Sequence, residues 1–178
     1  NAATTITQPA SGLSIFGFPN HATCPGGNDG SVSAFVFGGQ APYTYLWSNG
    51  ATTPNINNLV GTPGAGTPYQ IIVTDNRGCT STQTYNITSP AAITATLTPT
   101  NIACNGSSTG GFTVAAAGGT TPYTYLWSNS VVSFSNTISG LAEGTYTVTI
   151  RDANNCSSSF SGSITSSSAV TASIAGQV

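Results

Sequence analysis

The chain has 178 residues and very little charge, with two arginines, no lysine and four acidic residues. Two arginines cannot build a basic surface, which excludes nucleic-acid binding. No apolar run approaches the roughly 18 residues of a membrane span, and the first residues lack a signal-peptide pattern, so we expect no membrane insertion in this segment. Solubility must come from serine, threonine, asparagine and glycine, and charge does not oppose association between copies.

A tandem repeat organises the chain. The string PYTYLWSN occurs at residues 42–49 and again, unchanged, at residues 122–129, an offset of 80 residues. A further landmark, ITQPA at residues 6–10, matches ITSPA at 87–91. We therefore read the chain as an excerpt of a longer array. The expected domains are the end of a preceding repeat or a donor-type strand (1–10), repeat 1 (11–89), repeat 2 (90–167) and the start of a following repeat (168–178).

Apolar residues that alternate with small or polar ones predict half-buried β-strands. The first such strand holds Val32, Ala34 and Val36, and its counterpart in repeat 2 holds Phe112, Val114 and Ala116. The second holds Tyr69, Ile71 and Val73, with the counterparts Tyr146, Val148 and Ile150. A polar turn ending in a cysteine follows each of the second strands, and it predicts an antiparallel return of the chain.

The repeated aromatic motif predicts the core of each repeat. Alternation places Tyr45 and Trp47 on one face of a strand, and Tyr125 and Trp127 on the equivalent face in repeat 2. We expect the two indoles to fill the cores, so that truncation of either to alanine costs about 3 to 5 kcal/mol.

The four cysteines allow three disulfide pairings. Only the pairs Cys24–Cys79 and Cys104–Cys156 let each repeat close on itself, whereas a Cys79–Cys104 bond leaves Cys24 to reach Cys156 across both repeats. We therefore predict the pairs within each repeat, which persist only outside the reducing cytosol. A zinc site is disfavoured, because CxxC spacing is absent and His21 is the one histidine.

Short strands, glycine-rich turns, a buried tryptophan and the absence of helical periodicity predict an all-β chain of two tandem immunoglobulin-like antiparallel β-sandwiches. The order Cys24, Gly38-Gly39, PYTYLWSNG, Gly66-Thr67, Gly78-Cys79 and ITSP resembles the SprB-type repeat of large cell-surface adhesins of gliding bacteria, related in shape to PKD-type sandwiches. The resemblance covers nearly all of both repeats. In repeat 2, Ser130 and Asn155 replace glycines of the pattern, both in predicted turns.

The resemblance implies a stalk or adhesive filament that is exported by the type IX route and held on the bacterial cell surface, without catalysis or cofactor. The residues agree with a non-catalytic chain. His21 lies in a segment rich in glycine and proline and is expected to be an exposed loop residue, and a glycosidase pair of carboxylates is not in reach. Asp75 and Asp152 are weak calcium candidates, because calcium needs about six to eight oxygen ligands. We expect them instead to accept backbone hydrogen bonds in their hairpin turns.

Two functions from different classes stay open. The first is a structural and adhesive role, in which the partners are neighbouring repeats, or other copies in a fibre that residues 2–9 or 169–178 could join as an added strand. A short connector from Ile87 to Ala103, stiffened by Pro90 and Pro99, is expected to hold neighbouring repeats in an extended row. The second is a carbohydrate-binding module, with surface polysaccharide as partner and Tyr43 and Tyr45 as stacking residues. Exposed aromatics on one sheet face would favour it.

Overall fold

The computed structural model describes residues 12–104, 106–129 and 131–167, and these are all-β without a helix. The chain divides into two compact units, Asn1–Ala91 (unit 1) and Ala92–Val178 (unit 2). The sequence predicts the division two residues earlier, at 89/90. The expected flanking segments, 1–10 and 168–178, lie outside the described residues.

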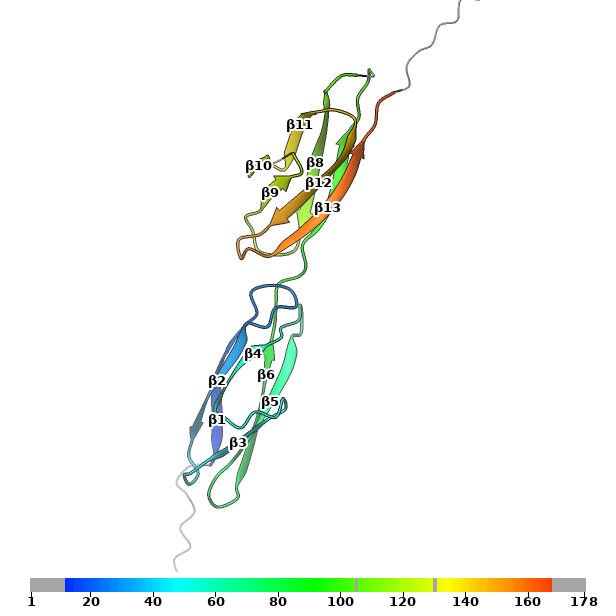
Figure 1. Ribbon diagram of the computed structural model, residues 1–178. Helices are drawn as coiled ribbons and strands as arrows, with labels where there is room; N and C mark the ends of the chain where they lie inside the picture. The colour runs from blue at the N-terminus through cyan, green and yellow to red at the C-terminus, as the bar shows by residue number, and fades with distance from the viewer. Residues whose placement is uncertain (1–11, 105, 130, 168–178) are drawn as a thin grey trace, which may run out of the picture. The chain divides into compact units, whose positions relative to one another are not determined.

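Unit 1 is a sandwich of two three-stranded antiparallel sheets (Figure 1). One sheet has the order β1-β2-β4, with the strands β1 (Ser14–Asn20), β2 (Gly30–Phe37) and β4 (Asn55–Leu59). The other has the order β3-β5-β6, with the strands β3 (Thr44–Trp47), β5 (Thr67–Thr74) and β6 (Thr80–Ile87). This distribution of strands is immunoglobulin-like, as predicted.

Unit 2 repeats this arrangement and adds one short strand. One sheet has the order β11-β8-β7, with the strands β7 (Thr94–Thr100), β8 (Gly110–Ala117) and β11 (Thr137–Leu141). The other has the order β10-β9-β12-β13, with the strands β9 (Thr124–Trp127), β10 (Val132–Ser133), β12 (Gly144–Arg151) and β13 (Ser157–Ile164). The predicted alternating strands are β2, β5, β8 and β12.

The predicted connector from Ile87 to Ala103 is wrong. Strand β6 continues to Ile87, and β7 already begins at Thr94 and contains Pro99, which lies opposite Phe112. A proline has no N–H to donate, but β7 is at the edge of its sheet, where that donor is not needed. Residues 88–93 are therefore the segment that joins the two units.

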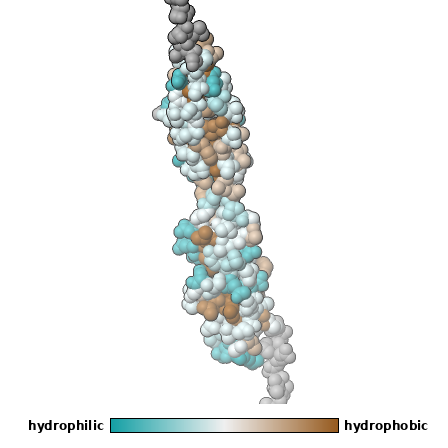
Figure 2. Space-filling view, turned by 90° about the vertical axis from the view of Figure 1, so that its right-hand side faces the viewer, coloured by the Kyte–Doolittle hydropathy of each residue, from teal (hydrophilic) through white to brown (hydrophobic). Residues whose placement is uncertain are grey.

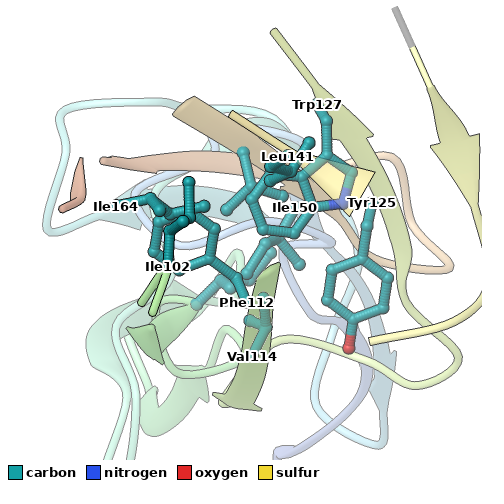
Figure 3. Close-up of a cluster of buried hydrophobic side chains, with 10 residues drawn as sticks. Ile102, Phe112, Val114, Tyr125, Trp127, Leu141, Ile150 and Ile164 are labelled. Atoms are coloured by element: carbon teal, nitrogen blue, oxygen red, sulfur yellow. The ribbon is translucent and has the colours of Figure 1, made fainter. Parts of the chain in front are cut away.

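Each unit encloses its own tryptophan. Trp47 and Trp127 are 2% and 1% exposed, and Tyr125 is also buried, whereas Tyr45 is half-buried at the margin of the core. Figure 3 shows the core of unit 2, in which Trp127 lies among side chains from both sheets, including Phe112, Leu141 and Ile150. Because each core closes within its own unit, each unit has an independent source of stability.

The aromatic partner of the tryptophan comes from a different strand in each unit. In unit 1, Tyr85 of β6 lies 6.1 Å from Trp47 between ring centroids. In unit 2 the equivalent of Tyr85 is Gly162, and Phe112 of β8 stacks on Trp127 at 5.7 Å. The two sandwiches therefore fill the same space with side chains from opposite sheets.

A residue of the first strand of each unit compensates for the different size of these aromatic side chains. A Cβ built on Gly17 of β1 would lie 2.6 Å from Cζ and Oη of Tyr85, so only glycine leaves room for that ring. Its counterpart in β7 is Leu97, which packs against the core of unit 2, where glycine replaces the tyrosine. Two different sets of three residues thus fill the same space. Unit 1 uses Gly17, Val32 and Tyr85, and unit 2 uses Leu97, Phe112 and Gly162.

Candidate functional site

Asp75 and Asp152 fasten the same two loops in each unit. Asp75 Oδ1 accepts hydrogen bonds from the backbone N–H groups of Arg77 and Cys79 at 2.9 Å each, and its Oδ2 accepts one from Gln40 N–H at 3.0 Å. Asp152 accepts the equivalent three bonds, each at 2.9 Å, from Asn154, Cys156 and Thr120. Both carboxylates therefore join their hairpin turn to the loop after the second strand of the unit, which is the backbone-accepting role expected for them.

The environment of Asp75 favours its ionised form. Burial raises the pKa of this carboxyl, but hydrogen bonds from the backbone of Cys79, Gln40 and Arg77, with the positive charge of Arg77, outweigh that effect. The pKa of Asp75 therefore lies below its ordinary value of 3.8. Its oxygens serve the protein backbone, and in the described part of the chain no three His, Cys, Asp or Glu side chains gather as metal ligands.

The predicted disulfides within each repeat are wrong. Cys79 and Cys104 are exposed free thiols, whereas Cys24 and Cys156 are disulfide-bonded. The pairs Cys24–Cys79 and Cys104–Cys156 each require one of the two free thiols, so neither pair is formed.

The positions of the cysteines within each unit explain this result. In unit 1, Cys79 directly precedes β6, while Cys24 follows Ala22, whose N–H donates to Thr88 O just past the other end of β6. A strand of this length separates its ends by roughly 25 Å, whereas bonded cysteines have Cα atoms about 4 to 7 Å apart.

Unit 2 has the same geometry. Cys156 directly precedes β13, and Cys104 lies at the far end of that strand, where Ile102 N–H donates to Thr165 O at 2.9 Å. Loop length and entropy favour the pairs within each repeat, but neither indicates at which end of the sandwich a cysteine lies.

His21 is exposed, as predicted, and has a structural contact. Its Nδ1 accepts a hydrogen bond from Thr88 N–H at 3.1 Å, beside the bond from Ala22 N–H to Thr88 O at 2.9 Å. The histidine therefore helps to fix the point where the chain leaves unit 1. This contact gives it no nucleophile to activate.

The motif tyrosines face the sandwich interior or its margin. The hydroxyl groups of Tyr43 and Tyr123 donate to the carbonyl oxygens of Gly38 and Gly118 in their own loops. Tyr125 is buried, and Tyr45 is half-buried against the core. The tyrosines that the sequence suggested for sugar stacking are thus engaged in holding the fold.

A different set of aromatics is exposed. Phe16 and Phe18 of β1 and Phe35 and Phe37 of β2 are 49 to 58% exposed, on the outer face of the β1-β2-β4 sheet. Phe16 pairs across the strands with Phe35, and Phe18 packs edge-on against Phe16 and Phe35 at 5.0 and 6.0 Å. We call these four residues the phenylalanine face. This face was not predicted, although Phe35 and Phe37 alternate with Val32, Ala34 and Val36 along β2, and Phe16 and Phe18 alternate with Ile15 and Gly17 along β1. This alternation is the signal that could have found it.

The equivalent face of unit 2 is not aromatic. The 80-residue offset places Thr96, Thr98, Ala115 and Ala117 at these positions, and Thr96 pairs with Ala115 as Phe16 pairs with Phe35. The two units therefore have the same framework with two different surfaces.

The sheet on the other side of unit 2 carries hydroxyl groups in place of charges. Three cross-strand pairs bridge β12 and β13 at 2.9 to 3.1 Å, namely Thr145–Ser163, Thr147–Ser161 and Thr149–Ser159. In the view of Figure 2, the brown hydrophobic areas of each unit are small and are separated by pale and teal polar surface.

An open groove in unit 2 has little free polar chemistry. Its volume is about 480 Å³, and Tyr123, Phe134 and Asn136 line it together with Val114. The Asn136 amide donates to Val114 O at 3.0 Å, so it binds the backbone of β8 rather than a ligand.

Among the described residues, no helix is long and apolar enough to cross a membrane.

The comparisons with known proteins agree with this fold. The model of the SprB repeat matches residues 19–52 and 96–132, once in each unit. No curated protein matches the chain.

Among solved structures, the three N-terminal domains of the highly immunogenic outer capsid protein (Hoc) of bacteriophage RB49 match with a TM-score of 0.52 and 16% identity over 87% of this chain. The I67–I69 fragment of the titin I-band matches over 90% of this chain with a TM-score of 0.47 and 15% identity, and the chain spans 59% of the Hoc chain and 66% of the titin fragment. Each unit thus carries a SprB repeat match on the sandwich described above, and the family model confirms the resemblance to the SprB repeat stated from the sequence.

Proposed function

We propose that this chain is a non-catalytic segment of an exported bacterial surface adhesin or extracellular filament, in which it acts as stalk and as contact surface. The observation that carries the proposal is the repetition of one self-contained core in two SprB-matching units. Such a segment gains reach by adding units, and weak contacts on many copies add up by avidity. The type IX export route is a further proposal, which rests on the resemblance to gliding adhesins.

The stalk role can be tested by pulling single molecules in a thiol reductant. Each unit should unfold in its own event and release roughly 20 to 25 nm of chain, at about 3.3 to 3.6 Å per residue. A variant with Trp47→Ala should lose one event and keep the other. A single event that takes up the whole chain would contradict the proposal of independent links.

The contact role can be tested on beads that carry one or many copies of the chain. We expect retention on polysaccharide-coated or abiotic surfaces only at high copy number, because each contact is weak. The matched control replaces the phenylalanine face by the residues of unit 2, through Phe16→Thr, Phe18→Thr, Phe35→Ala and Phe37→Ala. Equal retention of the control would remove this face from the proposal.

The phenylalanine face also favours a second candidate, a carbohydrate-binding module. Exposed aromatic rings can stack on the apolar faces of sugar rings, and a cluster of exposed aromatics on one sheet face can mark a binding site. Titration calorimetry with oligosaccharides at millimolar concentration should then detect binding to the native chain and none to the four-residue control. Absence of heat with the native chain would dismiss this candidate and leave the stalk role untouched.

A further inference from the structure

Neutral polar groups lie beside the phenylalanine face, on the outer side of the β1-β2-β4 sheet of unit 1 (Figure 1). Phe18 of β1 pairs with Ser33 of β2, and Ser33 pairs with Asn55 of β4, so the three residues form one row across the sheet. Ser33 and Asn55 point outward, because the residues next to them along β2 and the residue that follows Asn55 in β4 are buried. The row therefore begins with an aromatic ring and continues with a hydroxyl and an amide.

The polar ends of Ser33 and Asn55 are not used by the protein. Their side chains make no hydrogen bond within the part of the chain that the structure describes. The next row of the sheet differs, since the Asn20 amide donates to Ser31 Oγ at 3.2 Å. The Ser33 hydroxyl and the Asn55 amide can therefore bond to a molecule that lies on the phenyl rings.

The charge of this sheet restricts the ligand. None of its three strands contains a charged residue. Arg77, the one arginine of unit 1, lies in the turn between β5 and β6 of the other sheet, where its backbone N–H donates to Asp75. Acidic polymers and phosphate groups are held by cations, so the face matches an uncharged ligand.

The area of the rings argues against a protein partner. The four rings expose roughly 400 to 500 Å² together, because each is about half exposed and an aromatic side chain has about 150 to 250 Å² to bury. A stable protein interface takes about 800 Å² from each partner, which this face does not reach. An entirely apolar layer would cover the rings, but it would leave the Ser33 hydroxyl and the Asn55 amide without partners, at a cost in binding.

We propose that the phenylalanine face, together with Ser33 and Asn55, is a binding site for an uncharged polysaccharide. The C–H faces of the sugar rings pack on the phenyl rings, and the sugar hydroxyls exchange hydrogen bonds with the Ser33 hydroxyl and the Asn55 amide. The inference rests on the proposed function, in which the chain is a contact surface, and it adds the class of ligand and the two polar residues that select it.

Unit 2 keeps the polar row and lacks the rings. Thr113 of β8 pairs with Thr137 of β11 as Ser33 pairs with Asn55, but threonine and alanine stand in place of the four phenylalanines. The site therefore occurs in unit 1 alone of the two units, and unit 2 supplies a matched control.

The test measures retention of the whole chain on five surfaces. Insoluble cellulose, chitin and curdlan are the neutral polysaccharides, alginate gel is the acidic one, and polystyrene is the apolar surface without hydroxyls. We expect retention on polystyrene and on one or more of the neutral polysaccharides, and none above background on alginate.

The variant Ser33→Ala with Asn55→Ala separates the polar groups from the rings. It should weaken retention on the neutral polysaccharide about tenfold and leave retention on polystyrene unchanged, because only a sugar bonds to these groups. The control Thr113→Ala with Thr137→Ala should change neither. Urea unfolding followed by tryptophan fluorescence checks that both variants stay folded.

Four results would overturn the inference. Retention on none of the neutral polysaccharides would do so and would leave the stalk role, which the pulling experiment tests, untouched. Equal retention on alginate, or undiminished polysaccharide binding by the Ser33 and Asn55 variant, would mean that neither neutrality nor the polar row selects the ligand. Dimers of the native chain in sedimentation that disappear in the four-phenylalanine control would assign the face to a second copy.

Discussion

The exchange of the aromatic partner between the two cores predicts a strong coupling between three positions. In unit 2, a Cβ on Gly162 would lie 2.8 Å from Cε1 and 3.2 Å from Cζ of Phe112, and 3.4 Å from Cδ2 of Leu97. Gly162→Tyr therefore overpacks the core, which costs about 3 kcal/mol. Phe112→Val alone leaves a cavity beside Trp127 and costs about 2 to 3 kcal/mol, less than the ~3 to 5 kcal/mol of a truncation to alanine.

The combination of Leu97→Gly, Phe112→Val and Gly162→Tyr rebuilds in unit 2 the packing of unit 1. Since total core volume is then nearly kept, the triple variant should lose less than about 1.5 kcal/mol relative to the native chain. The three single losses should thus fail to add by several kcal/mol, which is the signature of residues that share one space.

The assay is urea unfolding in the Trp47→Phe background, where fluorescence reports only Trp127 and therefore unit 2. The reciprocal triple in unit 1, Gly17→Leu with Val32→Phe and Tyr85→Gly, is the matched control and is read through Trp47 in the Trp127→Phe background. Additive losses in the triple variant would refute the reasoning, because they would mean that the two cores are not alternative solutions of one packing problem.

Three further results are expected. An added Cβ at Gly17 would lie 2.6 Å from a tyrosine ring, so Gly17→Ala should cost unit 1 about 1 to 3 kcal/mol in urea unfolding, whereas Gly12→Ala, with open space around it, should be near neutral. Trp47→Phe should cost about 1 kcal/mol more than Trp127→Phe by hydrogen exchange resolved for each unit. The reason is that Trp47 Nε1 donates to a loop carbonyl at 2.8 Å, and Trp127 Nε1 has no hydrogen-bond partner in the described part of the chain. The lowered pKa of Asp75 contributes stability above its unfolded value, so unit 1 should lose stability as the pH falls below about 4, and Asp75→Asn should flatten that loss.

The strands and the two indoles could be predicted because alternation reports burial directly. Val32 and Ala34 lie in the core as their period indicates, and the motif tryptophans are buried. Local turn geometry was predictable as well. Asn155 takes a φ of 65°, close to the 80° of Gly78 that it replaces, because asparagine tolerates the left-handed region better than most residues.

The features that the sequence did not predict all depend on contacts between segments that are distant along the chain. Tyr85 lies in a strand that is mostly threonine, serine and glutamine, so its burial beside Trp47 follows only from the room left by Gly17. Pro99 suggests a break in the chain, but its place at a sheet edge removes the conflict. Cysteine pairing depends on the end of the sandwich at which each thiol lies, and cysteine spacing along the chain does not contain that information.

The hydroxyl pairs that cover β12 and β13 have a consequence for the medium in which the protein works. Dissolved ions weaken attractions and repulsions between charges by screening them, but a surface hydrated through neutral O–H groups presents almost nothing to screen. The electrostatic part of its folding and of its association with other molecules should therefore change little as the ionic strength rises.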